Sequence, residues 1–162
     1  MNTSSDTPIQ TFLAFDYGSK WTGLAVGSKL SQEPQLLKPI RVRQHKINQE
    51  ELEKVLNIWQ PHAFVLGIAY YVDETLSSTG KKAQEFAHYL KRKYHRPCYL
   101  VDERLSSWQA TIDSKNKQLK HTEIHSQSAA VILETFLCGL ENCTQSEWIF
   151  VTEPKLQIAA KY

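Results

Sequence analysis

The chain has 162 residues, of which 41% are hydrophobic and 22% are charged, so it can build the core of one domain and is not a disordered chain. The net charge is +2, from 19 Lys and Arg against 17 Asp and Glu, which is too small to argue for nucleic-acid binding by itself. No apolar run approaches the roughly 18 residues of a membrane span, and the N-terminus lacks a signal-peptide core. We therefore expect a cytoplasmic protein without membrane contacts.

The three cysteines are expected to be reduced thiols, because none is spaced from another cysteine or from a histidine as in a zinc site. Cys98 and Cys138 are interpreted as buried thiols. Cys143 is interpreted as an exposed one.

Two apolar runs joined by a short link with glycine follow a polar tail at residues 1–10. They predict strands over about residues 11–16 and 23–29 that form a hairpin. Asp16 stands where the first strand ends, and a buried carboxylate is costly unless it accepts hydrogen bonds or binds a cation. Both interpretations stay open for Asp16. A third strand over Leu36–Val42 is expected at a sheet edge, because Pro39 lacks a ladder donor.

The middle of the chain alternates helix signals with buried strands. Asn48 opens a helix that Pro61 ends, and residues 63–69 read as a buried strand. A loop with Asp73 and Glu74 follows, then an amphipathic helix over residues 81–94 and a strand over residues 98–101. The order predicts parallel strands with helical crossovers. The basic ends of the second helix fit a solvated face or a phosphate-binding patch.

The strand over residues 98–101 also ends in acids, Asp102 and Glu103, followed by Arg104. Side chains alternate along a strand, so only one of these acids can face the same side as Asp16. Arg104 pairs with the other acid or with phosphate. Downstream, the segment 114–121 predicts a mobile loop that carries Lys115, Lys117 and Lys120.

The last helix is predicted over residues 123–140, with an apolar stripe that must face the sheet. His125 lies on this stripe in the first turn, so it is either a satisfied core histidine or a polar group directed at the acids. Residues 148–151 predict an extra strand or a patch for a partner. Carboxylates gathered at strand ends suit Mg²⁺ or Mn²⁺. Two such ions about 3.5–4 Å apart can activate water and stabilise the leaving oxygen of a phosphodiester, which is the basis of a nuclease hypothesis.

Several segments resemble the YqgF family from about Phe12 to Leu140, namely FDYGSKWTGLAVG, FVLGIAYYVDET, and VDERLSS followed by SAAVILETFL. The resemblance implies an RNase H-like α/β fold over residues 11–142, with a five-stranded mixed sheet flanked by helices. Residues 1–10 are then a flexible tail and residues 143–162 a C-terminal extension. The family is similar to Holliday junction resolvases and is linked to maturation of the 5′ end of pre-16S rRNA.

The resemblance also implies a site. The first acid of the family matches Asp16, and the second falls in DER, where Glu103 is favoured over Asp102. His125 occupies the position of the third acid. These residues would hold Mg²⁺ or Mn²⁺ and catalyse cleavage, while nucleic acid would be bound by Lys20, Arg104, Lys115, Lys117 and Lys120. The implied partners are pre-rRNA or branched DNA and a ribosome precursor, for a monomer or weak homodimer.

Two other functions fit parts of the sequence. His125 and the altered segment GIAYYVDET favour a binding or ribosome-assembly factor of the same fold that has lost catalysis. The pattern D-x-G-x-K-x-x-G, which begins at Asp16, is also similar to the phosphate loop of actin-like ATPases. Those proteins close two domains around a nucleotide, and this chain has length for one.

Overall fold

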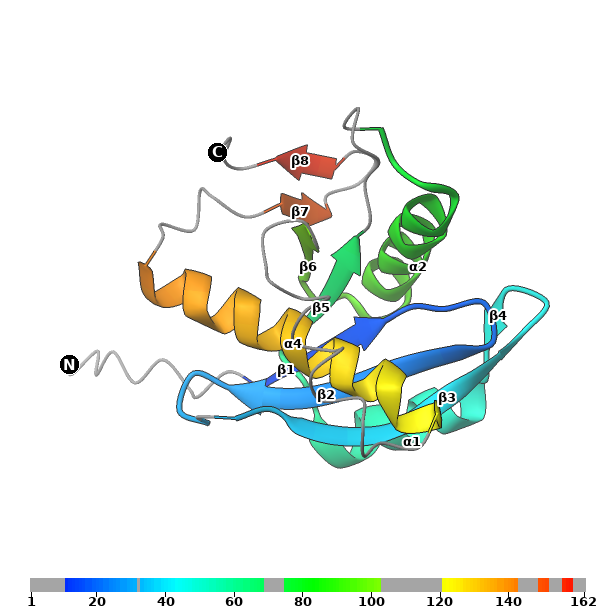
Figure 1. Ribbon diagram of the computed structural model, residues 1–162, viewed down its shortest axis with the longest axis horizontal. Helices are drawn as coiled ribbons and strands as arrows, with labels where there is room; N and C mark the ends of the chain where they lie inside the picture. Colours follow the sequence, from blue (N-terminus) through cyan, green and yellow to red (C-terminus); the bar gives the residue numbers. More distant parts are fainter. Residues whose placement is uncertain are drawn as a thin grey trace.

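The computed structural model describes residues 11–31, 33–68, 75–102, 121–142, 149–151 and 156–158. The described strands form one sheet in the order β4-β3-β2-β1-β5-β6-β7-β8. Helices cover both faces of this sheet, and α4 crosses over β1 and β2 on the side opposite α1 and α2 (Figure 1). The elements are β1 Thr11–Asp16, β2 Trp21–Ser28, β3 Gln35–Arg43, β4 Lys46–Ile47, α1 Gln49–Trp59, β5 Ala63–Ile68, α2 Ser78–Tyr94, β6 Cys98–Asp102, α4 His121–Asn142, β7 Ile149–Val151 and β8 Leu156–Ile158.

The predicted mixed sheet is confirmed. β1 pairs antiparallel with β2 and parallel with β5, and β5 pairs parallel with β6. The predicted count of five strands was too low, because the described residues form eight. β7 confirms the extra strand that was one of two predictions for residues 148–151. β4 and β8 have two and three residues, too few to produce a period in the sequence. β7 pairs with β6 and β8 with β7, so part of the C-terminal segment extends the sheet.

Helix ends follow the expected capping chemistry. The side chain of Asn48 accepts a hydrogen bond from the backbone N–H of Glu51 and caps α1 as predicted. α2 begins three residues before its predicted start, because the side chain of Ser77 accepts from the backbone N–H of Gly80. None of the helices in the described ranges is long and apolar enough to cross a membrane.

The sheet separates two groups of buried side chains, and strand alternation assigns residues to each. Leu13 and Phe15 of β1 pack with α1 and α2, whereas Phe12 and Ala14 pack with α4. The predicted stripe of α4 is confirmed where Ala129, Ile132 and Phe136 are buried. Cys98 is buried as predicted.

The prediction that Cys138 is buried was wrong. Its thiol is exposed, because position 138 is two residues beyond Phe136 and so lies off the face of α4 that packs on the sheet.

Pro39 lies in a β-bulge, on a part of β3 that has no strand on its outer side, so the predicted edge position holds locally although β4 is the terminal strand of the sheet. β3 lies between β2 and β4, although β4 pairs only with Val42 and Arg43. The register of β2 against β3 shifts between the pair Thr22–Ile40 and the pair Leu24–Leu37, so Lys38 and Pro39 lie opposite the single residue Gly23. A bulge tolerates proline because a ladder bond is already lost there.

Candidate active site

Asp16 is the last residue of β1 and pairs with Gly23 of β2. Alternation from Phe12 and Ala14 places its side chain on the face covered by α4. His125, in the first turns of α4, comes to the same place, and its Nδ1 lies 4.0 Å from Oδ2 of Asp16. The structure therefore brings together two of the residues that the sequence singled out.

The environment of Asp16 makes its carboxyl group harder to ionise than a carboxyl group in water. The side chain keeps 20% of its surface exposed, but the surrounding strands and α4 remove most water from the carboxyl group. This desolvation raises its pKa from 3.8 to about 6, against a hydrogen bond from the side chain of Ser128 that acts in the opposite direction. The Ser128 hydroxyl also lies 3.1 Å from the carbonyl oxygen of Ile124, so its one proton is shared between two possible acceptors.

Glycine allows α4 to approach the strands closely enough to bring His125 to Asp16. A Cβ atom on Gly23 would lie 1.9 Å from the carbonyl oxygen of His125 and 2.5 Å from the backbone nitrogen of Ser126. A Cβ atom on Gly18 would lie 2.5 Å from the carbonyl oxygen of Trp21 and 3.8 Å from Cε1 of His125. The backbone of α4 therefore rests directly on β2 at Gly23, which fixes the height of His125 above the sheet.

Ser126 connects α4 to the bulge. Its hydroxyl accepts a hydrogen bond from the backbone N–H of Leu24 at 3.3 Å and donates to the carbonyl oxygen of Leu37 at 2.6 Å. Leu24 and Leu37 are register partners next to the bulge, so the hydroxyl bridges two backbone groups that belong to neighbouring strands. Ser126, Ser128 and Gly23 were not predicted as site residues from the sequence. Three polar residues in a row on an otherwise buried helix, Ser126 to Ser128, were the available signal.

Replacement of Ser126 by alanine is expected to destabilise the protein by about 1–3 kcal/mol, because a buried N–H and a part-buried carbonyl lose the hydroxyl that bridges them. Urea unfolding measures this change. Thr135→Ala is the matched control, because the Thr135 hydroxyl bonds only the carbonyl oxygen of Val131 in its own helix among the described residues. Equal losses in both variants would contradict the bridging role of Ser126.

Asp102 lies away from this site. It ends β6, and alternation from Cys98 and Leu100 places it on the sheet face that α1 and α2 cover, opposite Asp16. Glu103, the favoured second acid, lies outside the described residues. In the part of the chain that the structure describes, no group of three His, Cys, Asp or Glu side chains is placed to hold a metal ion.

Lys20 is the only predicted nucleic-acid contact within the described residues. Its side chain is exposed on the link between β1 and β2, beside the end of β1 that carries Asp16. Arg104, Lys115, Lys117 and Lys120 lie outside the described ranges, as do Asp73 and Glu74. Arg41, a cation that was not predicted as a site residue, lies near Lys20. Its guanidinium stands 5.4 Å from the ring centre of Trp21.

Known proteins match this chain both in sequence and in fold. A family model described as RuvX, Holliday junction resolvase, matches residues 10–139. A protein of Buchnera aphidicola (subsp. Schizaphis graminum) is 38% identical over 76% of this chain and 93% of its own length. One of Legionella pneumophila (strain Paris) is 33% identical over 80% of this chain and 96% of its own length. Both carry the name "Putative pre-16S rRNA nuclease".

The solved structures agree in fold. RuvC of T. thermophilus, solved in complex with a Holliday junction substrate, matches with a TM-score of 0.51 and 12% identity, over 83% of this chain and 98% of that chain. At this identity the likeness concerns the fold alone, and it confirms the predicted RNase H-like α/β fold. The family match and the named relatives confirm the predicted resemblance and the predicted class of phosphodiester hydrolase.

Proposed function

Since the chain belongs to the RuvX family of Holliday junction resolvases, we propose that it is a divalent-metal-dependent nuclease that trims the 5′ end of pre-16S rRNA. The observation that carries this proposal is the desolvated carboxyl group of Asp16 at the end of β1, 4.0 Å from His125. The substrate follows from the names of relatives that are aligned over most of their length. Branched DNA is the competing substrate that the family description suggests.

The donors at this site fit a divalent cation. A carboxylate oxygen is the preferred ligand of Mg²⁺ and Mn²⁺, and an imidazole nitrogen suits Mn²⁺ better than Mg²⁺. A cation beside Asp16 would also offset the desolvation that now raises the pKa of its carboxyl group. We assign Asp16 and His125 as ligands, with Glu103 as the second acid, because Asp102 lies on the other face of the sheet. When bound, the metal activates water and stabilises the leaving oxygen.

The residues of the chain itself orient these groups. The Ser128 side chain hydrogen bonds to the carboxyl group of Asp16 and holds its orientation. Gly23 and Ser126 fix the first turns of α4 and thereby position His125. His125 is proposed as a metal ligand. The alternative is that His125 carries a proton. A measurement of metal affinity separates the two roles, because only loss of a ligand weakens metal binding.

Lys20 is proposed to contact a phosphate group of the substrate, together with Arg104, Lys115, Lys117 and Lys120. The support for Lys20 is its exposure on the link between β1 and β2, next to the end of β1 that carries Asp16. A ribosome precursor is the proposed setting of the reaction. We infer a cytoplasmic location, supported by the free, buried thiol of Cys98, and a monomer or weak homodimer.

The test uses purified protein and an RNA that spans the 5′ end of pre-16S rRNA. His125→Ala is expected to lower Mn²⁺ affinity about tenfold or more in calorimetry and to slow cleavage about 100-fold, because a metal ligand is lost. Glu134→Gln, an exposed position further along α4, is the control and should match the native protein. RNA binding without metal-dependent cleavage would instead support the binding factor that has lost catalysis.

A further inference from the structure

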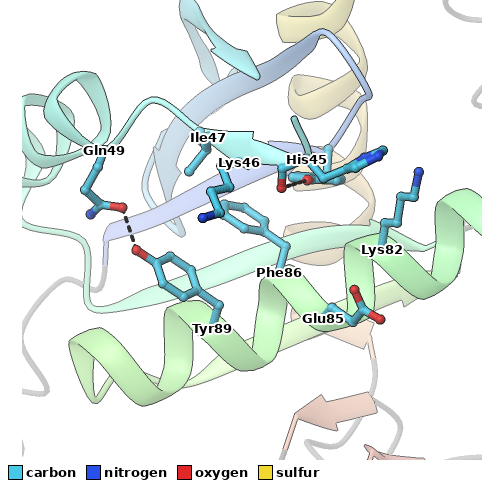
Figure 2. A pocket seen from close by; sticks show the side chains of 9 residues that line it. His45, Lys46, Ile47, Gln49, Lys82, Glu85, Phe86 and Tyr89 are labelled. Atoms are coloured by element: carbon cyan, nitrogen blue, oxygen red, sulfur yellow. Dashed lines mark hydrogen bonds between the residues drawn. The ribbon is translucent and has the colours of Figure 1, made fainter. Parts of the chain in front are cut away.

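A pocket that the proposed active site does not use lies between the β3–β4 hairpin and α2. It has a volume of about 630 Å³, which is within the usual range of ligand pockets. His45, Lys46 and Ile47 form one side and Lys82, Glu85, Phe86 and Tyr89 of α2 form the other (Figure 2). Tyr17, the residue directly after Asp16, and Gln49 complete the lining.

Three aromatic rings form a wall of this pocket. The ring of Tyr17 stacks on that of Phe86, with centres 4.9 Å apart and planes at 29°. The ring of Phe86 in turn stands 6.2 Å from that of Tyr89, with planes at 21°. Near-parallel rings at the edge of a cavity suit a flat aromatic ligand, and base–aromatic stacking is the usual way in which proteins hold unpaired bases.

The charges around the wall favour a ligand with a neutral ring and an anionic substituent. Lys46 comes from the hairpin, and Lys82 extends from α2 toward the hairpin. Within the described residues neither ammonium group forms an ion pair. Glu85 is the acid of the lining, and because its side chain is exposed it disfavours an anion next to it at the rim of the pocket. A base against the rings with phosphate groups at the two lysines would pair both lysines and place no charge against the rings.

The turn that holds the hairpin side of the pocket is strained. Gln44 and His45 have φ angles of 49° and 61°, the left-handed conformation that a two-residue turn requires and that glycine or asparagine usually supplies. This costs of the order of 1 kcal/mol for each residue. The hydroxyl of Tyr17 donates to the carbonyl oxygen of His45 at 3.0 Å, so one wall residue also holds the turn in place.

We propose that this pocket binds an unpaired nucleobase of the nucleic-acid strand that the active site cleaves, with the flanking phosphates at Lys46 and Lys82. The inference rests on the proposed function, because it extends the same substrate. Asp16 and Tyr17 are consecutive and face opposite sides of the sheet. A nucleic-acid strand that crosses the end of β1 would therefore pass from the active site at Asp16 to the pocket at Tyr17. A neighbouring hollow of about 420 Å³ is lined by Arg41, Arg43 and Lys46 and by one acid, Glu51, so cations outnumber acids beside the pocket.

The experiment uses the full chain without metal and a single-stranded RNA or DNA of about ten nucleotides, a length typical of single-strand sites. One base is replaced by 2-aminopurine, whose fluorescence falls when it stacks. We expect binding to quench this fluorescence with RNA, with DNA, or with both. Tyr89→Phe keeps the ring and should keep the quenching, whereas Tyr89→Leu should lose it. The double variant Lys46→Gln/Lys82→Gln should bind about tenfold more weakly than the native protein, because two phosphate contacts are lost.

The control is Lys29→Gln/Lys54→Gln, which removes the same charge at exposed positions outside the pocket. Unquenched fluorescence with both strands, or equal affinity of the two double variants, would overturn the proposal. Because no metal is present, the result is independent of cleavage. Metal-dependent cleavage that survives unchanged in the pocket variants would reject the pocket alone, and pocket-dependent binding without any cleavage would reject the nuclease assignment alone.

Discussion

Replacement of Asp16 by asparagine is expected to abolish metal-dependent cleavage and, at the same time, to stabilise the metal-free protein at neutral pH. Cleavage should fall at least about 100-fold, because the amide cannot supply the charge that holds a divalent cation. The gain in stability follows from the raised pKa of Asp16. Above pH 6 the folded protein keeps a desolvated carboxylate that the unfolded chain holds in water. Asparagine removes this cost.

The difference in stability between the native protein and the Asp16→Asn variant is expected to depend on pH. The carboxyl group has a pKa of about 6 in the folded protein and 3.8 as its reference value, so the native protein loses stability as the pH rises from about 4 to 6. At pH 8 the variant should be more stable by about 1–3 kcal/mol, because each unit of difference between the two pKa values corresponds to about 1.36 kcal/mol. Below pH 4 the difference should vanish. Urea unfolding with a chelator at both pH values measures it, and a variant less stable than the native protein at pH 8 would contradict the desolvated environment of Asp16.

The second large effect is expected at Gly23. Alanine there would put a Cβ atom 1.9 Å from the carbonyl oxygen of His125, which is a backbone atom that no rotamer change can move. We expect a loss of about 3 kcal/mol or more in the free energy of unfolding, because α4 must lift from β2. Mn²⁺ binding should fall with it, since His125 would move away from Asp16. Denaturant unfolding and calorimetry measure the two consequences.

Gly27→Ala provides the matched control on the same strand. A Cβ atom there would meet Oγ of Ser31 at 3.1 Å and Cδ2 of Leu133 at 3.2 Å, which are side-chain atoms that need to move by only a few tenths of an ångström. Its cost should be within about 1 kcal/mol. If the two glycine variants unfold at the same denaturant concentration, the close approach of α4 to β2 does not carry the stability attributed to it.

Much of the fold could be predicted because its long elements follow one period each. β1, β5 and the stripe of α4 are apolar where they face other elements, and Asn48 marks the start of α1 by its capping chemistry. Pro39 indicated a missing ladder bond but not its cause, because a bulge and a sheet edge leave the same signal in the sequence. β4 and β8 gave no signal because they have only two and three residues, whereas β7 lies in the segment 148–151, where an extra strand was one of two predictions.

The candidate site was predictable only in part. Asp16 and His125 were predicted from the end of a strand and the phase of a helix, and the structure brings them within 4.0 Å. The role of Ser126 was not predictable, because it depends on a register shift between β2 and β3. The ring of Tyr17 likewise finds Phe86 through tertiary packing between β1 and α2, which no local pattern encodes.

The alternation at the end of β1 restricts how the length of this protein can change. An insertion or deletion of one residue within β1 would exchange the faces of Asp16 and Tyr17, so the acid would point toward α2 and the ring toward α4. The same change would also shift the pairing of β1 with both β2 and β5. Homologous chains are therefore expected to vary in length at the opposite end of β1 and β2, around Lys29 and Leu30, while β1 keeps its number of residues.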